Sequence, residues 1–410
     1  MDELLHRERA IDLMRRHNID VLLATTPENV TYLTGHIGRR QYSCVSPLSF
    51  GVFTLSDGAI DLVVGGTDLS YYASRPGFAN VVRGYGALPG LAVEPGYTPV
   101  GEEARRFFEF LGSERRSPTA MDALAAAARE RGLVGARLAV DQPAGSPLLG
   151  LLSEQCGGST ILPAINLFRM IRLVKTSAEL ECMRRAAELN EHAIACLSDE
   201  LHQGTRELDL AALWRARVAG AGALPAWFYF GAGERSAWFV PPTNRRLEPG
   251  DMFVYDCGLV LDGYNADTGC CGSVGRPSRT DQRRFDAIFA ALEDAIGLVR
   301  EGAIGSEIYE TLVATARRCG FPEFDSSFAG HTLGLEARDL PFVLAPRVDL
   351  HDIFLPDTSD MPLPAGTVLN VEAPMGLLGH CGYHIERTIL VTSDGHLDLI
   401  AQPRRLLQVE

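Results

Sequence analysis

The sequence is short of positive charge. Lysine and arginine together number 38, against 52 aspartate and glutamate residues, which gives a formal net charge of -14 at pH 7. A protein whose main partner is nucleic acid or an anionic membrane usually presents a basic surface, and this chain has no clustered basic stripe. We therefore expect no nucleic acid and no membrane among its partners.

Long apolar runs and cysteine motifs are also missing. No stretch of 18 or more apolar residues occurs, and the charged opening MDELLHRERA lacks the apolar core of a signal peptide. These absences predict a cytoplasmic protein. The nine cysteines form no CxxC pair and their number is odd, so we expect mostly small buried thiols, although Cys257 and Cys381 flank acids of interest.

The length and the element pattern indicate two domains. At 410 residues, with 46% hydrophobic and 22% charged residues, the chain has globular values and room for two cores. We place the boundary so that residues 1–165 form one domain and residues 166–410 the other. Strand-like runs alternate with helical segments in the first, which predicts an α/β domain. The second combines antiparallel hairpins with helices, one expected after a T-x-x-E capping box at Thr176–Glu179 and others over 280–300 and about 306–319. This combination predicts α+β.

The segment from Met252 to Val274 reads as a hairpin that carries two acids. Asp262-Gly263 is a dipeptide that tolerates the positive φ angles of a type I′ turn. A two-residue turn there pairs Gly258 with Asp267 and puts Asp256 on the same face. Two such carboxylates require a shared proton, a basic residue or a metal ion to offset them, unless a bulge turns one of them to solvent.

A second hairpin, over residues 366–392, carries two more acids. Centring its turn on Gly379 places Glu372 opposite Glu386, and His384 lies on the face of Glu386. Between the hairpins, His331 sits between a glycine and a short apolar run. A lone histidine in such a place is usually structural, but four acids already paired favour a ligand role.

The order and spacing of these five residues resemble the pita-bread metallopeptidase family, which includes prolidase, aminopeptidase P, methionine aminopeptidase and creatinase. The aspartates are eleven residues apart and the glutamates fourteen. The segment VLLATTPENVTYLTG resembles the creatinase-type N-terminal domain, and LVKTSAELECMRRAAEL resembles the entry to the catalytic domain. The resemblance implies an α/β N-terminal domain, an α+β pita-bread catalytic domain and a homodimer.

The same resemblance implies a dinuclear centre of divalent Mn, Co, Fe or Zn ions. Asp267 and Glu386 would bridge the two ions, Asp256 would complete one site, and His331 with Glu372 would complete the other. Four carboxylates neutralise two divalent ions, and one imidazole among oxygen ligands does not select among these metals. Such a centre activates water for hydrolysis of a C-N bond.

The residues expected to face the substrate depart from the family pattern. Phe239 and Arg338 stand where peptidases of the family usually carry two more histidines, and His384 stands where arginine is common. The usual S-D-x-T-R-T is Ala-Asp-Thr-Gly-Cys-Cys over residues 266–271. We expect Glu372, His384 and Arg338 to be catalytic.

Two features of this altered shell allow alternative interpretations. Arg338 is suited to grip a substrate carboxylate, or it pairs with Asp339 or a neighbouring acid. The aromatic residues before the first hairpin either belong to the core or wall a pocket for a small or cationic substrate. Those expected to bind substrate, together with Arg338, are Tyr229, Trp238 and Phe239, and Trp227 belongs to the same aromatic group.

Three functions fit the sequence. The first is a dinuclear-metal hydrolase with Xaa-Pro dipeptidase or aminopeptidase specificity, acting on a short peptide. The second is a family member adapted to a small non-peptide metabolite, like creatinases, ectoine hydrolases and dimethylsulfoniopropionate lyases. Gly258, where those lyases have a third acid, disfavours the lyases, and the creatinases work without metal. The third is a non-catalytic peptide-binding module like those of histone chaperones, which five intact ligands disfavour.

Overall fold

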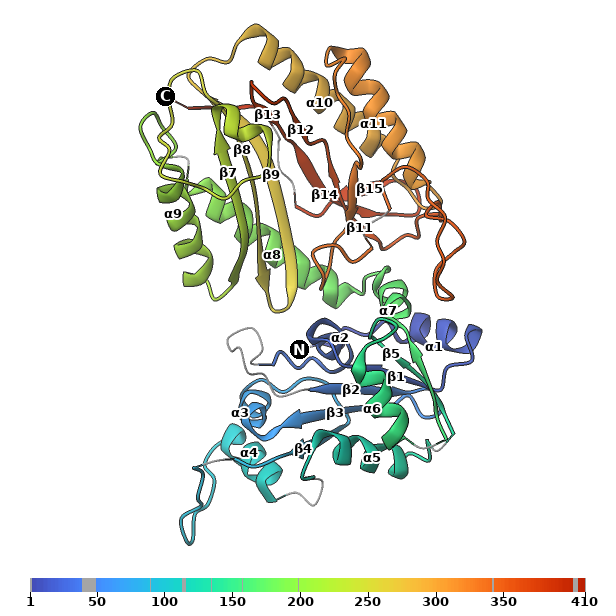
Figure 1. Cartoon of the computed structure of the whole chain (residues 1–410). Coiled ribbons are helices and arrows are strands. Elements are labelled where there is room, and N and C mark those ends of the chain that lie inside the picture. Colours follow the sequence, from blue (N-terminus) through green and yellow to red (C-terminus); the bar gives the residue numbers. More distant parts are fainter. Residues whose placement is uncertain are drawn as a thin grey trace. The chain divides into compact units, whose positions relative to one another are not determined.

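The computed structural model describes residues 2–38, 49–88, 90–112, 116–133, 135–156, 158–197, 199–340, 343–400 and 405–409. The chain divides into two compact units, Met1–Arg172 and Leu173–Glu410. Figure 1 shows the first unit in blue to green and the second in green to red. Each unit has its own sheets and helices, and each is described here by itself.

The first unit is built on one mixed six-stranded sheet in the order β4-β3-β2-β1-β5-β6. Strands β1 and β5 pair in parallel, whereas β1 and β2 are antiparallel. The strands are β1 (Val21–Ala24), β2 (Phe50–Thr54), β3 (Ile60–Gly65), β4 (Val81–Tyr85), β5 (Arg137–Val140) and β6 (Thr160–Pro163). The helices are α1 (Arg7–Arg16), α2 (Pro27–Thr34), α3 (Gly66–Ser74), α4 (Glu102–Gly112), α5 (Ala120–Glu130), α6 (Pro147–Gln155) and α7 (Ile165–Arg172).

The central strands of this sheet confirm the sequence prediction, and its edges show what the pattern missed. Strands β1, β2 and β3 are buried along their whole length, which gives them continuous apolar sequences. The edge strands β4 and β6 are partly exposed and carry a weaker apolar signal. The short helix α2 ends at Gly35, which adopts a left-handed φ of 71° after the last turn.

The second unit contains two four-stranded sheets and a small two-stranded one. Their orders are β16-β9-β8-β7, β10-β11-β14-β15 and β12-β13. The strands are β7 (Leu224–Ala232), β8 (Met252–Leu261), β9 (Tyr264–Val274), β10 (Gly330–Thr332), β11 (Val368–Glu372), β12 (Met375–Gly376), β13 (Gly382–Tyr383), β14 (Glu386–Val391), β15 (His396–Asp398) and β16 (Leu407–Val409). The helices are α8 (Ser177–Ala195), α9 (Glu207–Gly220), the 3₁₀ helix η2 (Gly233–Ala237), α10 (Arg279–Gly297) and α11 (Gly305–Cys319).

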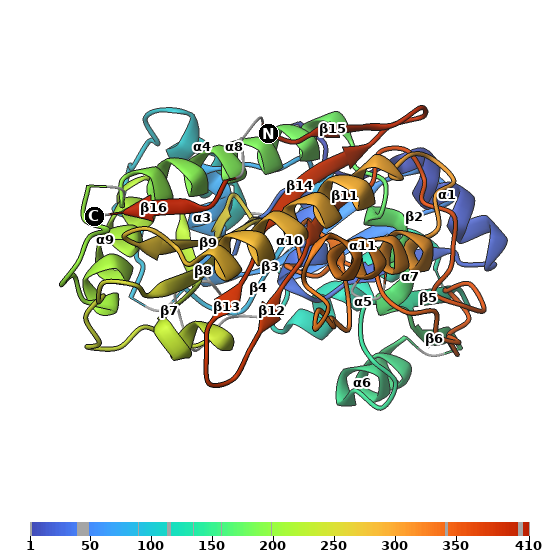
Figure 2. The ribbon, with the colours of Figure 1, turned by 90° about the horizontal axis from the view of Figure 1, so that it is seen from above.

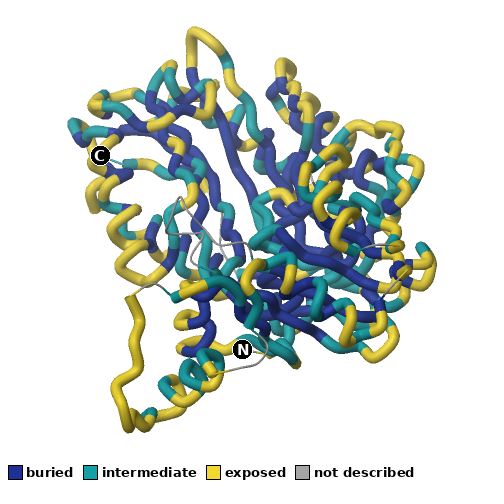
Figure 3. Tube along the Cα trace, turned by 60° about the horizontal axis from the view of Figure 1, so that its bottom comes forward, coloured by how far each residue is buried: buried dark blue, intermediate teal, exposed yellow. Residues whose placement is uncertain are grey.

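Helices cover the sheets of this unit on the sides where apolar residues gather. Helices α8 and α9 pack on β7, β8 and β9, and Figure 2 shows α10 lying beside α11. The predicted capping box at Thr176 is present, with the Thr176 and Glu179 side chains each bonded to the other's backbone N–H. Figure 3 shows the strands buried and the outer helix faces and many loops exposed.

Two expectations about composition can be compared with the described residues. Eight cysteines lie in the described part of the chain, and all eight are free. No helix in that part combines the length and the apolar character needed to span a bilayer.

The predicted combination of an α/β first unit and an α+β second unit is confirmed.

Candidate metal centre

The hairpin of β8 and β9 has the predicted two-residue turn. Both turn residues have positive φ angles, 51° at Asp262 and 90° at Gly263, as a type I′ turn requires. Gly258 pairs with Asp267, and Asp256 lies two residues before Gly258 on the same face. The ladder of this hairpin runs without a register shift, so no bulge separates the two aspartates.

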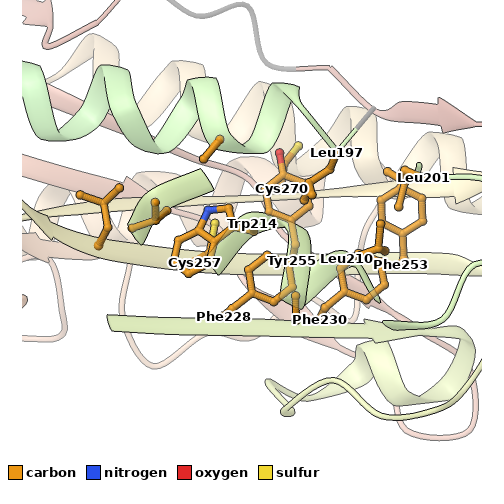
Figure 4. Packing of buried hydrophobic residues seen from close by; sticks show 14 of the residues in the cluster. Leu197, Leu201, Leu210, Trp214, Phe228, Phe230, Phe253, Tyr255, Cys257 and Cys270 are labelled. Carbon is orange, nitrogen blue, oxygen red and sulfur yellow. The ribbon is translucent and has the colours of Figure 1, made fainter. Parts of the chain in front are cut away.

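The two faces of this hairpin differ in character. Phe253, Tyr255 and Cys257 of β8 point into an apolar cluster between the sheet and helices α8 and α9 (Figure 4). Side chains alternate between the two faces of a strand. Asp256 and Asp267 therefore point away from that cluster, and the apolar packing on one face fixes the direction of the acids on the other.

The second pair of acids also has the predicted register. Glu372 at the end of β11 lies directly opposite Glu386 at the start of β14. On the other side of β11, His331 of β10 pairs with Asn370. The Asn370 amide donates a hydrogen bond to Oε2 of Glu386 at 3.0 Å. Three neighbouring strands thus supply two carboxylates and one imidazole.

The two sheets meet where these acids lie. A β-bridge between Cys270 of β9 and Ile385, just before β14, joins them. Nε2 of His331 lies 3.5 Å from Oδ2 of Asp267 and 3.5 Å from Oε1 of Glu372. The imidazole therefore stands between an acid of the first hairpin and an acid of the second.

The carboxylates strongly perturb one another. Burial raises the pKa of Asp256 well above its ordinary value, and the charges of Asp267 and Glu386 raise it further. Burial also raises the pKa of Glu372 well above its ordinary value, again with help from the neighbouring acids, while the charge of Arg338 opposes this rise. Glu372 and Glu386 are buried and Asp256 and Asp267 are half-buried, and four carboxylates this close cannot all be ionised without a compensating cation.

The tautomer of His331 points to the nature of that cation. Its Nδ1 lies 3.1 Å from the carbonyl oxygen of Thr332, which can only accept, so Nδ1 carries the proton. Nε2 of the neutral ring then presents a lone pair to two carboxylate oxygens at 3.5 Å, too long for a good hydrogen bond. Ligands of one metal ion, with bonds near 2.1 Å, lie about 3.0 to 3.5 Å apart.

An orphaned oxygen supports the same conclusion. Oδ1 of Asp267 is buried and has no hydrogen-bond partner among the residues that the structure describes. A buried carboxylate oxygen in that state is costly unless a cation binds it. Four carboxylates and an imidazole with a fixed tautomer fit divalent cations such as Mn, Co, Fe or Zn.

Trp227 has a role that the sequence did not reveal. Its indole Nε1 donates to Oδ1 of Asp256 at 2.6 Å, and Trp227 pairs with Gly258 across β7 and β8. A Cβ atom at Gly258 would lie 2.1 Å from the indole ring. The glycine therefore makes room for the tryptophan, and no third acid fits there. Only the β7–β8 register, which we did not predict, would have identified this contact.

Three of the aromatic residues are exposed rather than part of the core. Tyr229, Trp238 and Phe239 are 38%, 43% and 44% exposed, so the core interpretation is wrong for them. The Phe239 ring lies edge-on to His384 with 5.5 Å between centroids and 6.1 Å from the ring of Tyr229. His384 itself is fully buried, and its Nε2 lies 3.2 Å from Oε2 of Glu386.

A pocket of about 450 Å³ opens beside these aromatic side chains. Its wall combines apolar surface with one acid and several small polar groups. The lining residues are Ser236, Ala237, Trp238, Phe239, Val254, Asp325, Ser326, Ser327, Phe328, Pro374, Met375, Gly376 and Tyr383.

An ion pair between Arg338 and Asp339, one of the two alternatives that the sequence left open for this arginine, is not formed. Asp339 instead binds the ammonium of Lys175, the only lysine in the sequence, at 2.7 Å, and both side chains are buried. The guanidinium of Arg338 lies 5.3 Å from the centroid of the Phe328 ring, and Phe328 lines the pocket. Arg338 is exposed and forms no hydrogen bond or ion pair within the described ranges.

A second polar cluster lies away from the four acids and is already satisfied. Asp281 near the start of α10 accepts hydrogen bonds from Ser278, His380 and Tyr383 at 2.6 to 2.8 Å. Burial raises the pKa of the adjacent Cys381 thiol to about 12, so it stays protonated near neutrality. This cluster attaches the β12–β13 turn to α10.

Comparison with known proteins agrees with this geometry. Residues 181–393 match the model of metallopeptidase family M24. The Xaa-Pro dipeptidase of Pyrococcus furiosus is 26% identical over 242 residues, 58% of this chain and 66% of that protein, which is just under two thirds of its length. The probable dipeptidase PepE of Mycobacterium tuberculosis is 24% identical over 382 residues, 83% of this chain and 98% of that protein.

The solved structures extend the likeness to the whole chain. The X-Pro aminopeptidase of Thermotoga maritima superposes with a TM-score of 0.72 over 98% of this chain and 99% of that one, at 22% identity. This likeness confirms the predicted fold class, an α/β N-terminal unit followed by a pita-bread unit. Because the family model covers more than half of the sequence, the chain belongs to metallopeptidase family M24.

Proposed function

We propose that this M24 enzyme is a dinuclear metal-dependent hydrolase that cleaves a C-N bond in short peptides, with Xaa-Pro dipeptidase or aminopeptidase specificity. One observation carries the proposal: four carboxylates and the Nε2 lone pair of His331 converge at one buried point without a matching set of cations among the described residues. The names of the relatives, Xaa-Pro dipeptidase and X-Pro aminopeptidase, favour a peptide substrate.

In this proposal five side chains hold two divalent ions. By the resemblance, Asp267 and Glu386 would each serve both ions, Asp256 would serve one of them, and His331 with Glu372 would serve the other. When bound, such ions polarise a scissile carbonyl and lower the pKa of water. Glu372 is the proposed acceptor of a proton from such water, because its carboxylate lies among the converging acids, with Oε1 at 3.5 Å from Nε2 of His331.

Side chains behind the acids keep them in position. The Trp227 indole donates to Asp256 at 2.6 Å and the Asn370 amide donates to Glu386 at 3.0 Å. Supporting contacts of this kind usually tune metal affinity 10- to 100-fold.

The substrate is proposed to lie in the pocket lined by Trp238, Phe239 and Phe328. Arg338 stands on the face of Phe328, Asp339 is paired with Lys175 instead, and the charge of Arg338 acts on the carboxyl of Glu372. A planar guanidinium held in this way suits bidentate binding of a substrate carboxylate. Tyr229, edge-on to Phe239, extends the aromatic wall.

A second candidate is an enzyme of the same chemistry that acts on a small non-peptide amide. It is favoured by Phe239, which cannot donate a hydrogen bond or carry a proton at a place where peptidases of the resembled family have histidine. The indole against Gly258 leaves no room for the third acid of the lyase group. A non-catalytic binding module would not require a buried imidazole with its lone pair among carboxylates.

The experiment is a substrate panel with Mn or Co added. Xaa-Pro dipeptides, Xaa-Pro tripeptides and non-proline dipeptides are compared with small amides, amidines and sulfonium compounds. Turnover of proline peptides supports the peptidase. Turnover confined to small amides or amidines favours the second candidate, and activity without any metal requirement contradicts the mechanism. The homodimer and the cytoplasmic location stay predictions from the sequence.

A further inference from the structure

The imidazole of His384 is fully buried and lies against the acids of the second hairpin. We infer that His384 is a second imidazole ligand of the metal centre, binding an ion through Nε2 beside Glu386. This inference rests on the metal centre of the proposed function. It changes the expected donor set from four carboxylates and one imidazole to four carboxylates and two imidazoles.

The distances suit ligation. Nε2 of His384 lies 3.2 Å from Oε2 of Glu386, within the separation of about 3.0 to 3.5 Å expected for two ligands of one ion. Donor atoms of Glu372, His384 and Glu386 all lie within 4.8 Å of one another, and all three residues are buried. The His384–Glu386 spacing resembles the 3.5 Å spacings between Nε2 of His331 and its two acids.

The backbone opposite His384 is shaped to admit the ring. A Cβ atom on Gly269 of β9 would lie 2.2 Å from Nε2 and 2.3 Å from Cδ2 of His384, so any other residue there would push the imidazole away from the acids. The bridge between Cys270 and Ile385 holds the two strands at this separation. Gly269 is one of the positions at which the segment after Asp267 departs from S-D-x-T-R-T.

Neighbouring groups restrict the ring to this direction. Phe239 meets the imidazole edge-on, at 90° and 5.5 Å between centroids. The backbone N–H of His384 is hydrogen-bonded to Cys271, which lies beside Gly269 on β9. A side chain with no exposed surface and contacts on two sides has little freedom to turn its Nε2 away from Glu386.

Charge and bonding favour a ligand over a purely structural histidine. Oε2 of Glu386 already accepts a hydrogen bond from Asn370 at 3.0 Å, so it does not depend on His384 for a partner. Four carboxylates balance two divalent ions, and a neutral imidazole preserves that balance while adding a bond. Arginine, common at this place in the resembled family, has no lone pair to bind a metal.

A consequence follows for metal preference. Imidazole nitrogen suits Zn, Fe and similar later metals, whereas all-oxygen sites suit Mg, Ca and Mn. A second imidazole therefore shifts the relative affinity of the centre away from Mn and towards Co and Zn. The relevant ligand class is a first-row transition-metal ion of the later part of the series.

The test counts imidazoles in the wild-type protein loaded with Co(II), by X-ray absorption fine structure at the cobalt edge. Two ions with two imidazoles per chain are expected, from His331 and His384. Two ions with a single imidazole overturn the inference and leave the proposed hydrolase intact. No cobalt binding at all overturns the metal centre itself, and the inference with it.

Variants then assign the second imidazole. His384→Gln and Gly269→Ala are expected to lose one imidazole and the corresponding part of the visible cobalt spectrum, and to raise the Co(II) Kd about 10- to 100-fold. His351→Gln, at an exposed loop position, is the matched control and keeps both imidazoles and the wild-type Kd. Wild-type spectra and a Kd within about twofold in folded His384→Gln protein would overturn the assignment.

Discussion

The two units both bury acids, but they neutralise them differently. In the first unit Asp61 is fully buried between Arg83 and Arg131, with the Arg83 guanidinium at 3.1 Å. Asp141, also fully buried, accepts five hydrogen bonds of 2.6 to 2.9 Å from Thr25, Thr26 and Asn29. Each of these acids is satisfied by the chain itself.

In the second unit four acids converge at one point instead. Oδ1 of Asp267 has no hydrogen-bond partner in the described part of the chain, and burial raises the pKa of both Asp256 and Glu372 well above ordinary values. The same chain that pairs Asp61 with two guanidiniums brings these four acids together, as the proposed metal ions would require. Buried charge is therefore structural at Asp61 and Asp141, and we propose that it is functional at the four converging acids.

The largest expected effect is on Asp267. Asp267→Asn removes a bridging carboxylate, so we expect metal content to fall and kcat/KM to drop at least about a thousandfold, or about 4 kcal/mol. The metal-free variant should resist urea as well as or better than the metal-free wild type, because one repelling buried charge is gone. Asp262→Asn, in the turn of the same hairpin, is the matched control and should retain metal and activity. If the metal-free Asp267→Asn variant unfolded at a much lower urea concentration than the metal-free wild type, Asp267 would have a structural role, contrary to this account.

Asp61 should show the opposite pattern. Asp61→Asn leaves Arg83, which is 2% exposed, without its buried partner, and we expect unfolding free energy to fall by about 3 kcal/mol. Metal content and kcat/KM per folded molecule should not change. Asp57→Asn removes a half-exposed partner of Arg131 and should cost about 0.5 kcal/mol at most. Urea titration measures the unfolding free energy of the two variants, and elemental analysis measures their metal content. Loss of metal in Asp61→Asn would contradict a purely structural role for Asp61.

Glu179 should make the unfolding free energy depend on pH, with an effect of intermediate size. Burial raises its pKa to about 7 despite the nearby Lys175, whereas an unfolded glutamate has a pKa of about 4.3. The folded state thus holds the proton more tightly, and this group's contribution to stability is lost as the pH rises from about 4 to about 7. Glu179→Gln can still accept the hydrogen bond from the Thr176 N–H and carries no charge. Its stability relative to wild type should increase by roughly 2 kcal/mol from pH 5 to pH 8, and a constant difference would refute this account.

Arg338 carries the smallest expected effect. Arg338→Ala should raise KM for a substrate with a free carboxylate about tenfold, or about 1.4 kcal/mol, with little change in kcat. Arg338→Lys keeps the charge but not the planar fork and should recover only part of the loss. An equal KM increase for a substrate whose carboxylate is amidated would show that Arg338 does not bind that group.

The hairpins explain why so much of the centre was predictable. Asp262-Gly263 and Gly379 mark the turns, and antiparallel pairing then fixes Gly258 opposite Asp267 and Glu372 opposite Glu386 by counting alone. Such local rules hold because the two strands of a hairpin are joined directly.

Contacts between segments far apart in the sequence were not predictable. The placement of Trp227 against Asp256 depends on the β7–β8 register across a bulge near Pro225. The pairing of Asp339 with Lys175 joins residues 164 positions apart, and sequence spacing carries no information about it. The room that Gly269 makes for His384 likewise appears only once two sheets are joined.

The most direct test of the functional contrast is the metal content of the purified enzyme. Elemental analysis after gel filtration in Co(II) or Mn(II) buffer, followed by removal of loosely bound ions, should give about two ions per chain in active protein, and chelation should abolish activity reversibly. Active protein that contains no metal and is unaffected by chelators would contradict the account.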